Sequence, residues 1–137
     1  MPTGKDHPHA EMADGEALRQ VIARVHPQHE ALYLRAHDLV LEAVPGIRHS
    51  VDLVDGSIGY GARQFGYGGW GMAALSPHRG WVSLFFMKGV QVSDPGGLLE
   101  GSGKLMRHVK LRSVEALEQR AGAIQELLTA ASRLHGE

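Results

Sequence analysis

The sequence predicts an α+β fold, in which a mostly antiparallel sheet of four to five strands carries helices packed on one face. Apolar residues recur at helical spacing towards both ends of the chain. Between these ends, 13 of the 18 glycines lie in the 48 residues from Gly56 to Gly103, where long helices are disfavoured. The turns in this region are short, and short turns force antiparallel pairing. The expected order is two helices, three strands, a loop, a fourth strand and a final helix.

The start of the chain is expected to lie outside the fold. Residues 1–13 contain Pro2, Gly4 and Pro8 and no apolar periodicity, which is typical of a flexible tail. The remaining residues, 14–137, have the length of a single domain.

Two helices follow this tail. Asp14 is a suitable N-cap for the first helix, which Pro27 ends. The same proline suits the first turn of a second helix, which runs to about Val44 and is stopped by Pro45 and Gly46. The apolar stripes of these helices are Leu18, Val21, Ile22 and Val25 in the first, and Leu32, Ala36, Leu39, Val40 and Ala43 in the second.

The central region contains three strand candidates, rich in aromatic and β-branched residues and separated by glycine-bearing turns. These candidates are Ser57–Phe65, Trp70–Leu75 and Gly80–Phe86. Two consecutive hairpins are the simplest arrangement of these segments. We expect Trp81, Phe85 and Phe86 to serve the core between sheet and helices.

The last third of the chain predicts a loop, a strand and a helix. Ser93–Gly103 is a glycine-rich loop, and Met106–Arg112 is the next strand. Ser113 is then expected to cap a helix over Val114–Leu134. Its buried stripe is Leu117, Ile124, Leu127, Leu128 and Ala131.

Composition excludes several classes of protein. The 137 residues hold 14 Lys and Arg against 15 Asp and Glu, so there is no overall attraction to nucleic acid or to an acidic membrane surface. The absence of cysteine excludes disulfides, thiolate zinc sites and cysteine nucleophiles. No apolar run approaches the roughly 20 residues of a membrane helix, and no secretory signal core is present. We expect a cytoplasmic protein that binds neither nucleic acid nor membrane.

Two glycine motifs have structural explanations. Gly66 to Gly71 satisfies G-x-G-x-x-G, but no helix follows it, and hairpin glycines account for it better than dinucleotide binding. Gly101-Ser102-Gly103-Lys104 lacks the first glycine and the final Ser or Thr of a P-loop. No arrangement typical of catalysis is recognisable, so an enzyme is the less favoured class.

Basic residues concentrate at the predicted fourth strand. Lys104, Arg107, Lys110 and Arg112 fall within nine residues, and strand alternation places Arg107 on the face opposite to the last two. Ion pairs with helix acids and solvated edge charges would explain them. The alternative is an anion site formed by Lys104, Arg107 and the amides of the Gly101–Gly103 loop.

The nine histidines raise the question of a metal site. His29 and His37 are eight residues apart, roughly 12 Å along a helix, which is too far to share one ion. His7 and His9 belong to the predicted tail. Whether His49, His78 and His108 converge is left open by the sequence, so the metal ligands are unknown.

The second half of the chain resembles the YdhG-like family, a bacterial domain of unknown function. The resemblance rests on Phe86-Met87-Lys88-Gly89 and on the run from Asp94 to Leu111, DPGGLLEGSGKLMRHVKL. It extends from about Glu30 to the C-terminus. Where that family usually carries Trp-Gly-Met-Pro, this chain has Tyr60-Gly61-Ala62-Arg63. The resemblance implies a small α+β fold and no established enzyme activity, and it implies iron as a possible ligand because some members are described as frataxin-like iron chaperones.

The sequence therefore favours a non-enzymatic module that binds a small anionic ligand. The alternative is a frataxin-like iron or metal-handling chaperone. The predicted ligand-binding residues are Tyr60, Arg63, Trp70, Gly101, Gly103, Lys104 and Arg107. The oligomeric state is left open.

Overall fold

The computed structural model describes residues 9–11, 15–61 and 71–136, and its elements confirm the α+β class. The helices are α1 (Gly15–Val25), α2 (Glu30–Ala43) and α3 (Val114–Gly136), with short 3-10 helices η1 (Pro27–His29) and η2 (Gly89–Gln91). The strands are β1 (His9–Glu11), β2 (His49–Asp52), β3 (Ile58–Tyr60), β4 (Ala73–Pro77), β5 (Val82–Phe86) and β6 (Arg107–Leu111).

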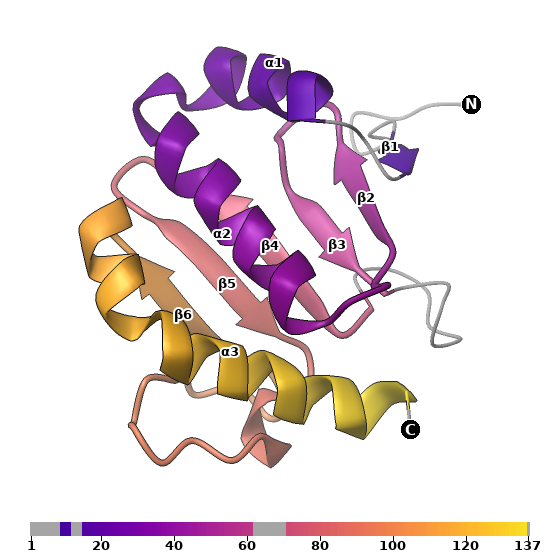
Figure 1. Ribbon diagram of the computed structural model, residues 1–137, viewed down its shortest axis with the longest axis vertical. Coiled ribbons are helices and arrows are strands. Elements are labelled where there is room, and N and C mark those ends of the chain that lie inside the picture. Colours follow the sequence, from indigo (N-terminus) through magenta and orange to yellow (C-terminus); the bar gives the residue numbers. More distant parts are fainter. Residues whose placement is uncertain (1–8, 12–14, 62–70, 137) are drawn as a thin grey trace.

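The strands form one antiparallel sheet in the order β1-β2-β3-β4-β5-β6, as Figure 1 shows. From β2 onwards each strand pairs with the next along the chain, while the helices α1 and α2 connect β1 to β2. The sheet of the described residues thus has six strands, where four to five were expected. Four strands were located in the sequence, and the structure adds β1 and β2 to them.

The strand β1 changes the expectation for the start of the chain. His9–Glu11 pairs with β2, His9 opposite Asp52 and Glu11 opposite Ser50, so these three residues belong to the sheet instead of the predicted tail. Their apolar content is too low to indicate a strand, and backbone pairing with an edge strand needs no apolar pattern.

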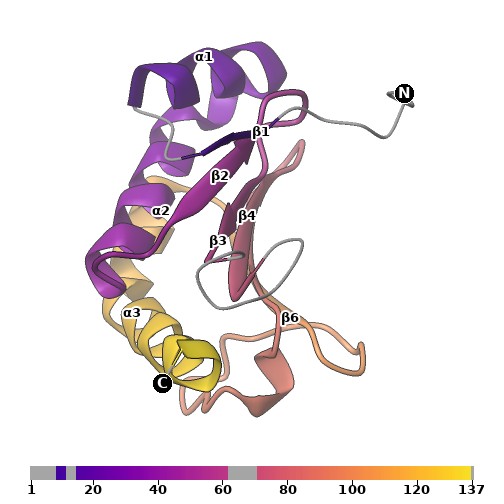
Figure 2. The same ribbon diagram turned by 90° about the vertical axis from the view of Figure 1, so that its right-hand side faces the viewer.

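All three helices cover the same face of the sheet, as Figure 2 shows. The core between these layers contains the predicted stripes of α1 and α2, with only Val25 and Ala43 left half-buried. In α3, the five predicted apolar residues are all buried. The described ranges contain no helix with both the length and the apolar character needed to span a bilayer.

Only one of the three aromatic residues expected in the core is there. Phe86 is fully buried, whereas Phe85 and Trp81 are half-buried and stay outside the core cluster. Successive side chains of a strand point to opposite faces, so Val82, Leu84 and Phe86 meet the helices and Phe85 cannot. The expectation for Phe85 and Trp81 was therefore wrong.

Local signals explain where the helices begin and end. Pro27 opens η1 instead of an α-helix, so the second α-helix begins three residues later than predicted. Gly46 adopts a φ of 84°, which disfavours other residues and turns the chain towards β2. At α3, the Ser113 Oγ accepts the Ala116 amide at 3.0 Å, which confirms the predicted cap.

Candidate functional site

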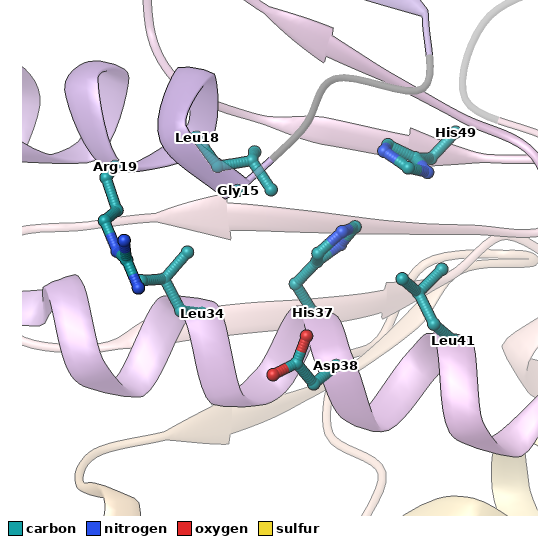
Figure 3. A pocket seen from close by; sticks show the side chains of 8 residues that line it. All are labelled: Gly15, Leu18, Arg19, Leu34, His37, Asp38, Leu41 and His49. Atoms are coloured by element: carbon teal, nitrogen blue, oxygen red, sulfur yellow. The ribbon is translucent and has the colours of Figure 1, made fainter.

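A pocket of about 260 Å³ lies where α1 begins, between α1, the middle of α2 and the start of β2 (Figure 3). Its volume is slightly below the range of roughly 300–1,000 Å³ that is usual for small-molecule sites. The residues that line it are Gly15, Leu18, Arg19, Leu34, His37, Asp38, Leu41 and His49. The pocket is therefore suited to a ligand smaller than a nucleotide.

Two buried imidazoles form one wall of this pocket. His37 is 5% exposed and His49 is 7% exposed, and their ring centroids lie 4.7 Å apart in an edge-on arrangement. Behind them, Tyr60 is fully buried, and its hydroxyl lies 2.8 Å from the His37 Nδ1. These three side chains form a polar cluster within an otherwise apolar layer, which we call the imidazole–phenol cluster.

Regular secondary structure fixes each member of the cluster. His37 follows Tyr33 by four residues and precedes Val40 by three, which puts all three on the buried face of α2. His49 and Tyr60 are direct partners in the β2–β3 pairing, so their side chains share the face of the sheet that meets α2. The cluster consequently joins one helix to two strands.

Burial determines the protonation of two members of the cluster, His37 and Tyr60. It lowers the pKa of His37 from 6.5 to about 4, with a smaller contribution from His49, so His37 is neutral at pH 7. Burial also raises the pKa of Tyr60 well above 10, so this phenol keeps its proton. A buried phenol that donates to the His37 Nδ1 leaves the imidazole proton on Nε2. In this arrangement, His37 provides a neutral N–H donor that its protein partner does not use.

Opposite charges flank the opening of the pocket. Arg19 on α1 and Asp38 on α2 are both exposed, and Figure 3 shows the Arg19 side chain extending from α1 towards Leu34, one turn before Asp38. Leu18, Leu34 and Leu41 supply apolar surface among the polar groups. The pocket thus combines a cation, an anion, apolar walls, the neutral imidazole of His37 and the ring of His49.

A second buried phenol lies on the same side of the sheet. Tyr33 is 1% exposed, and its hydroxyl has no hydrogen-bond partner among the described residues. Burial raises the pKa of Tyr33 well above 10, and the negative charges of Asp55 and Asp52 add to this rise. Tyr33 is the natural comparison for Tyr60, because both phenols are buried and protonated but only Tyr60 bonds to a histidine of the pocket.

Of the predicted ligand residues that the structure describes, Tyr60 lies apart from the others, which belong to the loop before β6 and to its first residue. Tyr60 faces the core from β3, while Gly101, Gly103 and Lys104 lie on the exposed loop before β6. The strands β4 and β5 separate β3 from β6, so Tyr60 and Arg107 are on the order of 14 Å apart across the sheet. The other predicted residues, Arg63 and Trp70, fall outside the described residues.

Within the predicted loop, Arg107 has a structural role. Its Nη1 donates to the carbonyl oxygens of Gly103 and Met106, each at 2.7 Å, and so ties the loop to the start of β6. Lys104 is exposed. An anion at this loop would meet a guanidinium that already holds two carbonyl groups.

Neither His37 nor His49 is among the ligand residues that the sequence predicted. A signal for His37 was present, because it stands at helical spacing within the apolar stripe of α2. His49 had no comparable signal, since the short β2 lacks an apolar pattern. Among the residues that the structure describes, no three His, Asp or Glu side chains converge in a way that would hold a metal ion.

Comparisons with known proteins give no relative for this chain. No protein-family model, no curated protein and no solved structure matches it. The resemblance to the YdhG-like family therefore stays a prediction, and so does the metal-handling role that it implies.

Proposed function

We propose that this protein is a non-enzymatic module that binds a small carboxylate in the pocket between α1, α2 and β2. The observation that carries the proposal is the pair of buried imidazoles, His37 and His49, in the wall of a pocket whose opening bears Arg19. Burying polar groups costs stability unless their hydrogen bonds are satisfied, so polar clusters inside an apolar layer often mark binding sites.

The pocket offers a distinct partner for each part of such a ligand. The Arg19 guanidinium suits the carboxylate, because charge-assisted bonds to a planar carboxylate are among the strongest available to a side chain. The three leucines suit a branched apolar group, and the Nε2 proton of His37 suits an oxygen acceptor. Asp38 favours a ligand that also carries an amino group and disfavours a second negative charge.

The test is a calorimetric titration with two matched ligands, leucine and 4-methylpentanoate, which differ only in the amino group. We expect both to bind and leucine to bind more tightly. Arg19→Gln should weaken both by about tenfold, the usual effect of losing a charge-assisted bond. Asp38→Asn should remove the preference for leucine. Both ligands should be recovered unchanged, as a binding module requires.

A matched control uses Arg133, an exposed arginine near the end of α3. Arg133→Gln changes the net charge as Arg19→Gln does and should leave both affinities unaltered. Failure of both ligands to bind, or equal losses in the two arginine variants, would rule out this pocket as a carboxylate site.

A further inference from the structure

A second group of histidines lies at the end of α1, away from the pocket at its start. There the turn between β4 and β5 lies beside η1 (Figure 1), and it is attached through the Arg79 carbonyl oxygen. The His29 Nε2 lies 3.2 Å from this oxygen, and the Gln28 Nε2 donates to it at 3.3 Å. This attachment brings His26, just before η1, close to the turn that holds His78 and Arg79.

The Trp81 ring contacts two basic groups of this region, His78 and Lys110. The His78 ring stacks on the Trp81 ring with centroids 4.9 Å apart and planes 23° from parallel. The Lys110 Nζ lies 4.8 Å from the centroid of the Trp81 ring, a cation–π contact. The Trp81 Nε1 donates to the Ser83 Oγ at 2.8 Å, which fixes the indole in place. Trp81 thus holds an imidazole and an ammonium group against one rigid ring.

Basic groups from several elements act on one another here. Burial lowers the pKa of His26, and His29 and Arg79 lower it further. Burial likewise lowers the pKa of His78, and the charges of His26, His108 and Lys110 lower it further. Within the described ranges, none of His26, His78, Arg79 and Lys110 forms an ion pair with an acidic side chain. The charges that act on His26 and His78 are therefore all positive, and no ion pair within the described ranges compensates them.

We propose that His26, His78, Arg79 and Lys110 form a binding site for a phosphate group. All four carry N–H donors, and they come from three parts of the chain that the contacts of Arg79 and Trp81 hold together. A tetrahedral dianion accepts several such bonds at once and removes the mutual repulsion of the basic groups, whereas a carboxylate offers only two oxygens. All four residues are at least partly exposed, so a phosphate group reaches them from solvent.

This site is separate from the pocket of the proposed function. Arg19 and His26 are seven residues apart, which corresponds to roughly 10 Å along the helix direction. The phosphate site therefore stands or falls independently of the pocket.

The test follows the imidazole resonances of His26 and His78 by NMR while inorganic phosphate is added to the full chain. Sodium chloride holds the ionic strength constant, so that general screening does not change. We expect saturable shifts of both rings and a rise in both pKa values, because a bound anion favours the charged imidazoles. Shifts that do not saturate, or that chloride reproduces, would overturn the proposal.

Variants assign the binding to these residues. Arg79→Gln should weaken phosphate binding by about tenfold or more, while the control Arg133→Gln, at another exposed arginine, should leave it unchanged. Equal affinity in Arg79→Gln and the parent protein would refute the site. Parallel titrations with glycerol phosphate and phosphoserine then show whether the site prefers a phosphate group on a polyol or on an amino acid. Tighter binding of either compound than of inorganic phosphate supports the site.

A pH series isolates the role of the imidazoles. Sulfate remains a dianion throughout the range in which histidine titrates, so any change in its affinity reports the protein. We expect tighter sulfate binding at about pH 6 than at about pH 8, because His26 and His78 gain protons as the pH falls. An affinity that does not change with pH would exclude the two histidines from the site.

Discussion

Two pairs of histidines, one near each end of α1, show how differently the same side chain behaves in two environments. His37 and His49 are buried between helix and sheet, where His37 bonds to the Tyr60 phenol. His26 and His78 stand at the surface among Arg79, Lys110 and other histidines. Burial is the largest cause of a lowered pKa in His37, His26 and His78, but the other causes differ.

The comparison shows that the neighbours decide what a neutral histidine can do. In the pocket, charging His37 would place a cation in the core, so this residue is suited to neutral hydrogen bonding. At the surface, a bound anion reverses the effect of the surrounding cations, so His26 and His78 are suited to change charge on binding. Substitutions in the two regions should therefore differ in their effects on stability, on its pH dependence and on binding.

The largest effect is expected from removing the aromatic ring beneath the pocket. Tyr60→Ala deletes a fully buried ring and the partner of His37, and should lower the free energy of unfolding by about 3–5 kcal/mol. His78→Ala removes a partly exposed ring from the surface group and should change it by only about 0.5 kcal/mol. Urea unfolding measures both. Equal losses would show that the two regions do not differ in burial as described.

The next effect is a loss of stability in mild acid. The unfolded chain takes up a proton at His37 near pH 6.5, whereas the folded chain does so only near pH 4. The stabilisation from a neutral His37 is therefore complete above about pH 6.5 and declines as the pH falls towards 4. The free energy of unfolding should be lower by about 2 kcal/mol at about pH 5 than at about pH 7.5.

The control for this pH effect replaces the titrating ring by an amide. Urea unfolding between about pH 7.5 and pH 5 should show a flatter pH profile in His37→Gln than in the parent protein. Parallel profiles in the two proteins would assign the acid sensitivity to other groups.

A smaller effect separates the two buried phenols. Tyr60→Phe leaves the His37 Nδ1 without its partner and should cost about 1–2 kcal/mol. Tyr33→Phe removes a buried hydroxyl that has no partner among the described residues, and should be neutral or stabilising. Urea unfolding gives the stability change, and ¹⁵N NMR follows the proton of His37. A greater loss of stability in Tyr33→Phe than in Tyr60→Phe would contradict the assignment of the hydrogen bond to Tyr60.

The smallest effect concerns the basic loop before β6. The double variant Lys104→Ala, Arg107→Ala should change leucine affinity by less than about twofold, because four strand spacings, on the order of 19 Å, separate β6 from β2. Calorimetric titration of leucine into the double variant and into Arg19→Gln compares the two losses of affinity. If the double variant lost leucine binding and Arg19→Gln kept it, the carboxylate site would be the loop before β6, as the sequence predicted.

Much of the fold could be predicted from the sequence because local patterns specified it. The apolar stripes placed the cores of all three helices, and Ser113 and Gly46 marked two helix boundaries. The strands β1 and β2 could not be predicted, since each is very short and depends on pairing with its neighbour. The candidate site was missed for the same reason: His37 and His49 meet only because α2 packs over β2.

By itself, the sequence determined the class of the fold, the order of its main elements and the balance of its charges. These properties follow from spacing and composition, which act over a few residues at a time. Only the tertiary structure decided which histidines became buried hydrogen-bonding groups and which became surface groups among other cations. Solvent access and neighbouring charges are set by residues far away in the chain, so the chemistry of a histidine belongs to its place in the fold.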